Sequence, residues 1–245
     1  MHPWLRRALY ELIPGNCILC ESRSYRNLDL CRACEQDLPW LTRQCYGCAL
    51  PLASSITTCG ACTVSPPPWE HCFAAFEYTW PIDHLIGEFK NNGQLLTGKI
   101  LGSLLACAFA WYHPAAEFPD LLVPVPLHKD RLRQRGYNQA TEIADVLATH
   151  CRIAINAGLC RKIRETPQQK LLDARTRQRN IKNAYQLDHH VTGVRVGVVD
   201  DVVTTGATAR ELTETLLKAG AASVVVIALA RTPAPQQGPA DRHPV

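Results

Sequence analysis

The chain has 245 residues, of which 47% are hydrophobic, and this length and composition allow one or two globular domains with a sizeable core. Its 26 Lys and Arg residues against 22 Asp and Glu give a net charge of +4, which is too small to indicate a nucleic-acid-binding protein by itself. We identify no membrane-spanning stretch and no cleavable signal sequence, so we expect a cytoplasmic protein without stable membrane insertion.

Eight cysteines follow a short amphipathic stretch in residues 1–16, and they come as four CxxC pairs. Ten residues separate each pair from the next, so the pairs form a 14-residue repeat. In a reducing compartment such pairs are typical of metal ligands rather than disulfides, and two pairs complete the four-thiolate site of structural zinc. The predicted ligands are Cys17, Cys20, Cys31, Cys34, Cys45, Cys48, Cys59 and Cys62.

Eight ligands predict two zinc ions, and one at least if a single site is filled. Pairing neighbouring CxxC motifs gives a double zinc ribbon, whereas pairing first with third and second with fourth gives a cross-brace; the spacing allows both. We expect residues 1–63 to form an N-terminal helix and zinc domain, and the proline-rich residues 64–70 to form a stiff linker. Four scattered cysteines are expected to be small buried hydrophobes: Cys72, Cys107, Cys151 and Cys160.

From residue 71 the sequence takes on the pattern of an α/β domain. Residues 73–78 predict a strand, and apolar residues at helical spacing predict a helix that ends near residue 91. Residues 95–111 predict a second helix, rich in Leu and Ala. Residues 121–126, LLVPVP, predict a short buried strand that runs into a proline-bound loop.

Two basic segments come next. In LHKDRLRQRGYNQA, residues 127–140, basic side chains alternate from position 129 to 135, and Asn138 is placed to cap the following helix. Residues 161–182 carry eight Lys and Arg against two acids, a local net charge of +6. Arginines in this second segment are suited to clamping pyrophosphate, to following a nucleic-acid backbone, or to forming a solvated helix face, and the sequence leaves these readings open.

The stretch VRVGVVDDVVTTGATA, residues 194–209, carries the strongest signal in the chain. Its apolar start predicts a buried parallel strand, with Asp200 and Asp201 at the carboxyl end, where open α/β sheets bind ligands. A loop of small residues then opens a predicted helix and exposes backbone N–H groups that favour a phosphate. The residues of this loop are Thr204, Thr205, Gly206, Ala207 and Thr208. Residues 223–230 predict another buried parallel strand, and residues 232–245 a disordered tail.

The same stretch resembles the motif with which type I phosphoribosyltransferases bind phosphoribosyl pyrophosphate (PRPP). Together with the cysteine pairs, VPVP, RGYNQ and the pattern R-x-T-x-x-Q…L-x-x-R-x-x-x-R-N beginning at Arg164, the chain resembles the ComF/GntX-like family over most of its length. That resemblance implies a double zinc ribbon followed, in residues 71–231, by a type I phosphoribosyltransferase-like α/β domain, a parallel sheet with helices on both faces.

The resemblance also implies site residues. Asp200 and Asp201 would hold the ribose hydroxyls of PRPP, whose pyrophosphate carries Mg²⁺, and the loop 204–208 would hold the 5-phosphate. Further groups would contact pyrophosphate: a loop of Pro124, Val125 and Pro126, charge from Arg131 and Arg135, and Arg175 and Arg179 on a mobile loop that stabilises the departing pyrophosphate.

Three functions remain open at this point. The first is a PRPP-binding protein that acts in DNA uptake, DNA utilisation or natural competence. The second is a pentosyltransferase of nucleotide metabolism with an unidentified nitrogenous acceptor, and the third is an inactive PRPP sensor or nucleic-acid-binding scaffold. The resemblance implies PRPP, single-stranded DNA and a DNA-uptake ATPase as partners, the last of which would bring the protein to the inner face of the membrane. The acceptor and the oligomeric state are left open.

Overall fold

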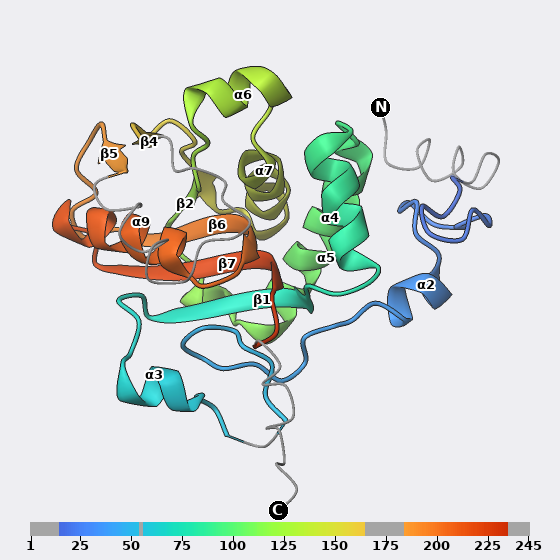
Figure 1. Ribbon diagram of the computed structural model, residues 1–245, viewed down its shortest axis with the longest axis horizontal. Helices are drawn as coiled ribbons and strands as arrows, with labels where there is room; N and C mark the ends of the chain where they lie inside the picture. The colour runs from blue at the N-terminus through green and yellow to red at the C-terminus, as the bar shows by residue number, and fades with distance from the viewer. Residues whose placement is uncertain (1–14, 54–55, 165–183, 235–245) are drawn as a thin grey trace, which may run out of the picture.

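Five parallel strands form the central sheet, in the order β1-β7-β6-β2-β3 (Figure 1). The computed structural model describes residues 15–53, 56–164 and 184–234. Apolar, mostly β-branched runs build the middle strands because both faces of a parallel sheet are covered. The strands are β1 (His71–Glu77), β2 (Leu121–Pro124), β3 (Ala154–Ile155), β6 (Arg195–Val203) and β7 (Ser223–Arg231).

Helices cover both faces of this sheet. On one face the buried side chains of three helices share a core with one side of the strands: α4 (Ile82–Asn91), α5 (Leu95–Tyr112) and α7 (Gln139–Cys151). On the other face α9 (Ala207–Lys218) packs against β6 and β7 and belongs to a second core cluster. The predicted α/β architecture, with a parallel sheet between helices, is therefore confirmed.

One helix of the described residues, α5, is long and apolar enough to span a membrane, contrary to the expectation that no segment has that length and apolarity. However, 56% of it is buried inside the protein. Ile100, Leu105 and Phe109 of this helix are almost fully buried in the core that covers the sheet. Packing against β1 and α7 therefore accounts for its apolar composition.

Two cysteine-rich modules precede the sheet. The first (residues 15–38) contains α2 (Arg32–Gln36), and the second (residues 44–53 and 56–64) contains α3 (Gly60–Val64). The segment between them runs along the outer edge of β1, where Leu41 N donates to Ala75 O (2.9 Å) and Glu77 N donates to Pro39 O (2.9 Å). This contact covers a sheet edge that would otherwise expose unpaired backbone groups.

The first basic segment forms a short helix, α6 (Lys129–Arg135). Gly136 ends it with φ +79°, a conformation that glycine adopts without strain. Asn138 caps α7 as predicted, since its Oδ1 accepts from Ala140 N (3.1 Å). Three short elements complete the fold: the 3₁₀ turn η1 (Ala115–Glu117) and an antiparallel pair, β4 (Cys160–Lys162) and β5 (Tyr185–Leu187).

Candidate metal and ligand sites

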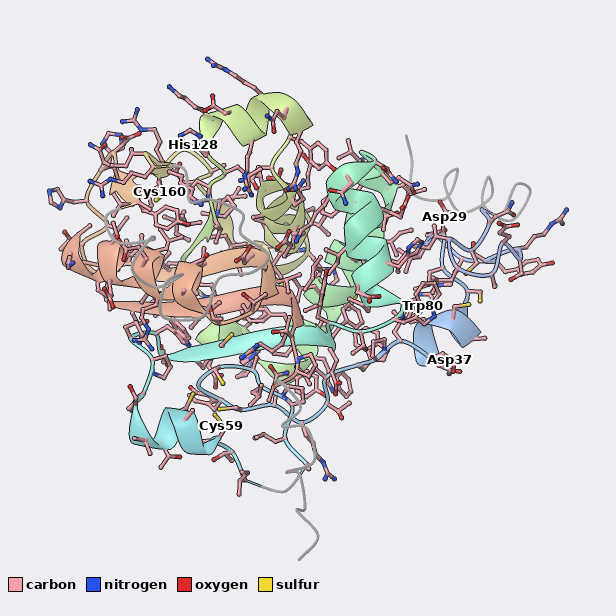
Figure 2. All side chains as sticks on the ribbon, in the orientation of Figure 1. Asp29, Asp37, Cys59, Trp80, His128 and Cys160 are labelled. Carbon is pink, nitrogen blue, oxygen red and sulfur yellow. The ribbon has the colours of Figure 1, made fainter. Side chains whose placement is uncertain are left out.

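The eight predicted metal ligands gather into two tetrads. Cys17, Cys20, Cys31 and Cys34 form one, and Cys45, Cys48, Cys59 and Cys62 form the other; within each, the sulfur atoms lie within 4.8 Å of one another. Neighbouring CxxC motifs are therefore paired, and the cross-brace is wrong. Figure 2 shows sulfur atoms of the second tetrad grouped around Cys59, below β1.

Sulfur spacing in the tetrads fits zinc. Four thiolates about 2.3 Å from a tetrahedral ion lie about 3.8 Å apart. The Sγ atoms of Cys20 and Cys31 are 3.8 Å apart, and those of Cys48 and Cys59 are 3.7 Å apart. Each tetrad uses all four positions of a tetrahedron, so both are suited to structural rather than catalytic zinc.

Backbone N–H groups point at the sulfurs, as they do in zinc knuckles. Cys59 N lies 3.2 Å from the Sγ of Cys45, and Cys34 N lies 3.4 Å from the Sγ of Cys31. Burial raises the pKa of Cys45, but backbone donors from Cys59, Cys48 and Gly47 outweigh burial and lower that pKa to about 7. Outside the tetrads, Cys72 and Cys160 are buried as expected, whereas Cys107 is exposed on the outer side of α5. The expectation of burial is therefore wrong for Cys107, and Cys151 is only half-buried.

The paired acids lie in β6, and the predicted phosphate loop follows this strand directly. The strand continues to Val203, so Asp200 and Asp201 sit inside its last part rather than beyond its end. Gly206 is the N-cap of α9 with φ +74° and leaves no side-chain cap on the helix. Among the described residues, the N–H groups of Thr204, Thr205 and Gly206 donate to no protein acceptor. They are free to bind an anion at the positive end of the helix dipole.

The predicted pyrophosphate loop leaves the sheet beside these acids. Pro124 of β2 is in register with Val199 of β6, one residue before Asp200, and Val125 N donates to Val199 O (2.9 Å). The side chain of Asn138 then fixes the loop, because its Nδ2 donates to Val125 O (3.0 Å). The structure therefore brings together the acids and the loops 124–126 and 204–208 at the carboxyl ends of β2 and β6.

The predicted arginines differ in where the structure places them. Arg135 donates from Nη1 to Gln139 Oε1 (2.8 Å) at the start of α7, so part of its guanidinium is already engaged. Arg131 lies half-buried on α6. Arg175 and Arg179 lie outside the described residues, between β4 and β5. Their predicted contact with pyrophosphate stays a prediction.

Lys90, at the end of α4, reaches the acid pair. Its Nζ lies 2.8 Å from Asp201 Oδ2, with the two side chains 26% and 15% exposed. Burial alone would lower the pKa of Lys90, but the neighbouring groups, Asp201 first and then Asp200, together outweigh burial and raise it. Burial, together with the neighbouring Asp201 charge, raises the pKa of Asp200 to about 7. The last turn of α4 is held in place by the Tyr137 hydroxyl, which donates to Phe89 O.

Sequence reasoning missed three residues that the fold brings next to the acids or to the loop 204–208: Lys90, Trp69 and Arg231. Trp69 ends the proline-rich segment and is 6% exposed, although a linker residue would be expected at the surface. Arg231 follows an apolar run, and it is buried and bonded to backbone carbonyls at the end of β7. A large aromatic after a proline run, and an arginine that ends a core strand, were the only sequence signals for the last two.

Comparisons with known proteins agree with this description. Residues 8–63 match the double zinc ribbon domain family. The chain is 34% identical over 223 residues to DNA utilization protein YhgH of Salmonella typhimurium, covering 90% of this chain and 98% of that protein. It is 31% identical over 221 residues to competence protein F of Haemophilus influenzae, covering 88% of this chain and 96% of that one.

Among solved structures, a purine phosphoribosyltransferase from Pyrococcus horikoshii covers 54% of this chain and 70% of its own, with 18% identity and a TM-score of 0.34. Trypanosoma cruzi hypoxanthine phosphoribosyl transferase covers 55% of this chain and 64% of its own, with 15% identity and a TM-score of 0.36. Likenesses at this level carry no argument about the site.

Proposed function

The chain belongs to the family of DNA utilization protein YhgH and competence protein F, and on that premise we propose that it binds PRPP with Mg²⁺ and acts in DNA utilisation. One observation carries the PRPP proposal: after Asp200, Asp201 and two further residues begins a loop whose first N–H groups have no acceptor in the described part of the chain, and this loop opens the helix α9. Carboxylates accept hydrogen bonds from sugar hydroxyls, and backbone N–H groups donate to phosphate. The acids therefore suit the ribose hydroxyls of a ribose 5-phosphate, and the loop suits its phosphate.

The pyrophosphate of PRPP would lie toward the loop 124–126, beside the acids. Mg²⁺ prefers oxygen ligands and keeps substrate phosphates in its coordination shell. Asp200 and Asp201 offer the carboxylate oxygens that such an ion, or the waters around it, would use. Bound there, Mg²⁺ would neutralise pyrophosphate charge. Lys90 supplies a positive charge next to Asp201.

Phosphoribosyl transfer to a nitrogenous acceptor is the second candidate, and the raised pKa of Asp200 favours it. A group that titrates at about 7 is suited to accept a proton near neutral pH. The family's printed names concern DNA utilisation and competence, so we keep PRPP binding as the first claim and turnover as the second.

Calorimetric titration with PRPP and Mg²⁺ tests the binding proposal. We expect saturable binding by the wild-type protein and a loss of about a hundredfold or more in affinity for Asp200→Asn/Asp201→Asn, since two charged hydrogen-bond acceptors are removed. Asp145→Asn is the matched control, because Asp145 is exposed on α7. Absence of binding by the wild-type protein would reject both the PRPP-binding protein and the transferase.

The titration of Asp200 predicts a pH dependence of the same binding. Its pKa is raised from 3.8 to about 7, so the protein holds this proton up to neutral pH, and Asp200 contributes stability at low pH that is lost as the pH rises through about 7. The ionised form is the better ligand, so PRPP–Mg²⁺ affinity should rise between about pH 6 and about pH 8. Asp200→Asn should remove this part of the pH dependence, leaving only the titration of PRPP itself.

For the DNA part of the proposal we infer contact with the basic side chains of α6 and β4, and a contribution from residues 161–182, whose local net charge in the sequence is +6. On α6 four basic side chains accompany one acid, Asp130, and Figure 2 shows nitrogen-tipped side chains around His128 and Cys160. Nucleic-acid phosphates attract such a surface. The affinity for labelled single-stranded DNA, measured by anisotropy, should fall steeply with salt, and less steeply for Arg175→Ala/Arg179→Ala than for Arg43→Ala, a variant of an exposed arginine between the two cysteine modules. An unchanged slope would reject this placement.

A further inference from the structure

We propose that the second cysteine module positions the phosphate loop, and that Arg231 and Trp69 are the residues through which it does so. The inference deepens the proposed function, because it concerns the loop at residues 204–206 to which we assign the 5-phosphate. Both residues contact the module on one side and this loop on the other, and neither belongs to the cysteine tetrad.

Arg231 joins the two parts by hydrogen bonds to carbonyl oxygens. It stands at the end of β7 and is 9% exposed. Its Nε donates to Cys48 O in the second tetrad (2.8 Å), and its Nη1 donates to Thr204 O in the loop (2.6 Å) and lies 3.2 Å from Val203 O. The same Nη1 donates to Thr232 O (2.7 Å).

These bonds fix the direction of the loop's N–H groups. In a trans peptide the C=O of one residue and the N–H of the next point in opposite directions. Because the carbonyls of Val203 and Thr204 are held toward Arg231, the N–H groups of Thr204 and Thr205 point away from it. Thr232 N also donates to Val203 O (3.1 Å), which fixes the first of these peptides a second time.

Trp69 makes the second connection. Its indole Nε1 donates to Gly47 O (2.5 Å), between the second tetrad's Cys45 and Cys48. On the loop side its ring lies so close to Gly206 that a Cβ there would be 3.3 Å from the ring. The guanidinium of Arg210 in α9 lies 5.8 Å from the ring centroid, so the indole also contacts the first turn of that helix.

Charge gives a reason for a buried arginine at this place. A buried cation is stable when an opposite charge or several acceptors compensate for its lost hydration. Four thiolates around one Zn²⁺ carry a net charge of −2, and Cys48 belongs to that tetrad. Arg231 is bonded to the backbone carbonyl of a residue in this tetrad, so its positive charge would offset part of the negative charge of a zinc-loaded tetrad.

Two conservative variants, each with a matched control, test the inference in the full-length, zinc-loaded protein. Arg231→Lys keeps the charge but loses the planar fork, and Arg195→Lys is its control at the amino end of β6, where Arg195 donates to Ala116 O (3.0 Å). Trp69→Phe keeps a ring but loses the N–H, and Trp40→Phe is its control, since the Trp40 indole donates to Glu35 O (2.8 Å) in the first cysteine module.

The primary measurement is hydrogen exchange of two backbone amides, with zinc content as a check on folding. Arg210 N donates to Gly206 O (2.9 Å) and Thr232 N donates to Val203 O, so both amides report on the order of the loop. Both should exchange faster in Arg231→Lys and Trp69→Phe, and PRPP–Mg²⁺ affinity should fall about tenfold, the effect of one lost hydrogen bond to a charged group. Neither control should change these values.

Unchanged exchange in Trp69→Phe and Arg231→Lys, with two zinc ions retained, would overturn the inference. If Arg231→Lys does not fold, Trp69→Phe decides. Faster exchange without any PRPP binding by the wild-type protein would leave the coupling intact and reject the proposed function instead.

Discussion

The two cysteine modules share their ligands and spacing but support different parts of the protein. In each, the third cysteine, Cys31 or Cys59, is the N-cap of a five-residue helix with nearly the same backbone angles. The first module buries Leu30 and Leu38 in the core that contains α4 and α5, whereas the second lies on the side of α9 and the phosphate loop (Figure 1). The metal repeat therefore determines the local fold of each module, and the residues around it determine what the module supports.

Removal of one tetrad at a time is expected to give the largest difference between the two cysteine modules. Cys17→Ser/Cys20→Ser and Cys59→Ser/Cys62→Ser should each lose one of two zinc ions, and each module should lose stability on the order of several kcal/mol because zinc binding drives its folding. Only the second pair should also weaken PRPP–Mg²⁺ binding, since only that tetrad is bonded to Arg231. Metal analysis, thermal unfolding and calorimetry check this. Equal loss of affinity in both variants would mean that the modules do not differ in the way described.

A matched pair of leucines separates packing from positioning. Leu38 and Leu41 flank the segment along β1 and are 5% and 3% exposed, but they belong to different cores. Leu38→Ala and Leu41→Ala should each cost about 2–4 kcal/mol in the free energy of unfolding, measured by urea denaturation. We expect only Leu41→Ala, on the side of the second module, to weaken PRPP binding. A weaker affinity in Leu38→Ala alone would contradict the assignment of the two sides.

The sequence predicted the eight ligands and the α/β domain because both are local patterns. The pairing of the CxxC motifs could not be predicted from a local pattern, because equal separations between the motifs allow both the ribbon and the cross-brace. The connections of Trp69 and Arg231 are less local still, since their partners Gly47 and Cys48 lie 22 and 183 residues away in the chain. Lys90 likewise meets Asp201 only because α4 ends beside β6. Such contacts depend on strand order, which no single motif contains.

Gly206 in the phosphate loop can be compared with Gly93 in the turn between α4 and α5. Gly206 and Gly93 have φ of +74° and +67°, so alanine is strained at both. A Cβ at Gly93 would meet nothing within 4 Å, whereas a Cβ at Gly206 would lie 3.3 Å from Trp69. Gly93→Ala should therefore cost about 1 kcal/mol and leave PRPP binding unchanged. Gly206→Ala should cost more, about 2 kcal/mol, and weaken binding because it pushes the loop away from Trp69. Urea denaturation and calorimetry measure both effects.

Buried histidines beside the second module are expected to give the smallest effect. His71 stacks between Tyr46 of that module and His113 at the end of α5, with ring centroids 5.2 and 4.9 Å apart. Burial lowers the pKa of both histidines from 6.5, although Glu117 faces His113 and partly opposes the shift, and Glu70 does so for His71. The ring nitrogens of His71 are buried without a partner among the described residues.

A histidine with a lowered pKa binds its proton more weakly in the folded than in the unfolded chain, so its contribution to stability is present above about pH 6.5 and is lost as the pH falls. The loss should stay below about 1 kcal/mol for each, because both carboxylates reduce the cost of charging the rings. Acid also releases zinc from thiolates, so the measurement is the difference in melting temperature between wild type and His113→Phe as a function of pH. His84→Phe, an exposed histidine on α4, is the control. If His113→Phe and wild type lose stability in parallel below about pH 6.5, His113 contributes nothing to the acid sensitivity of this side.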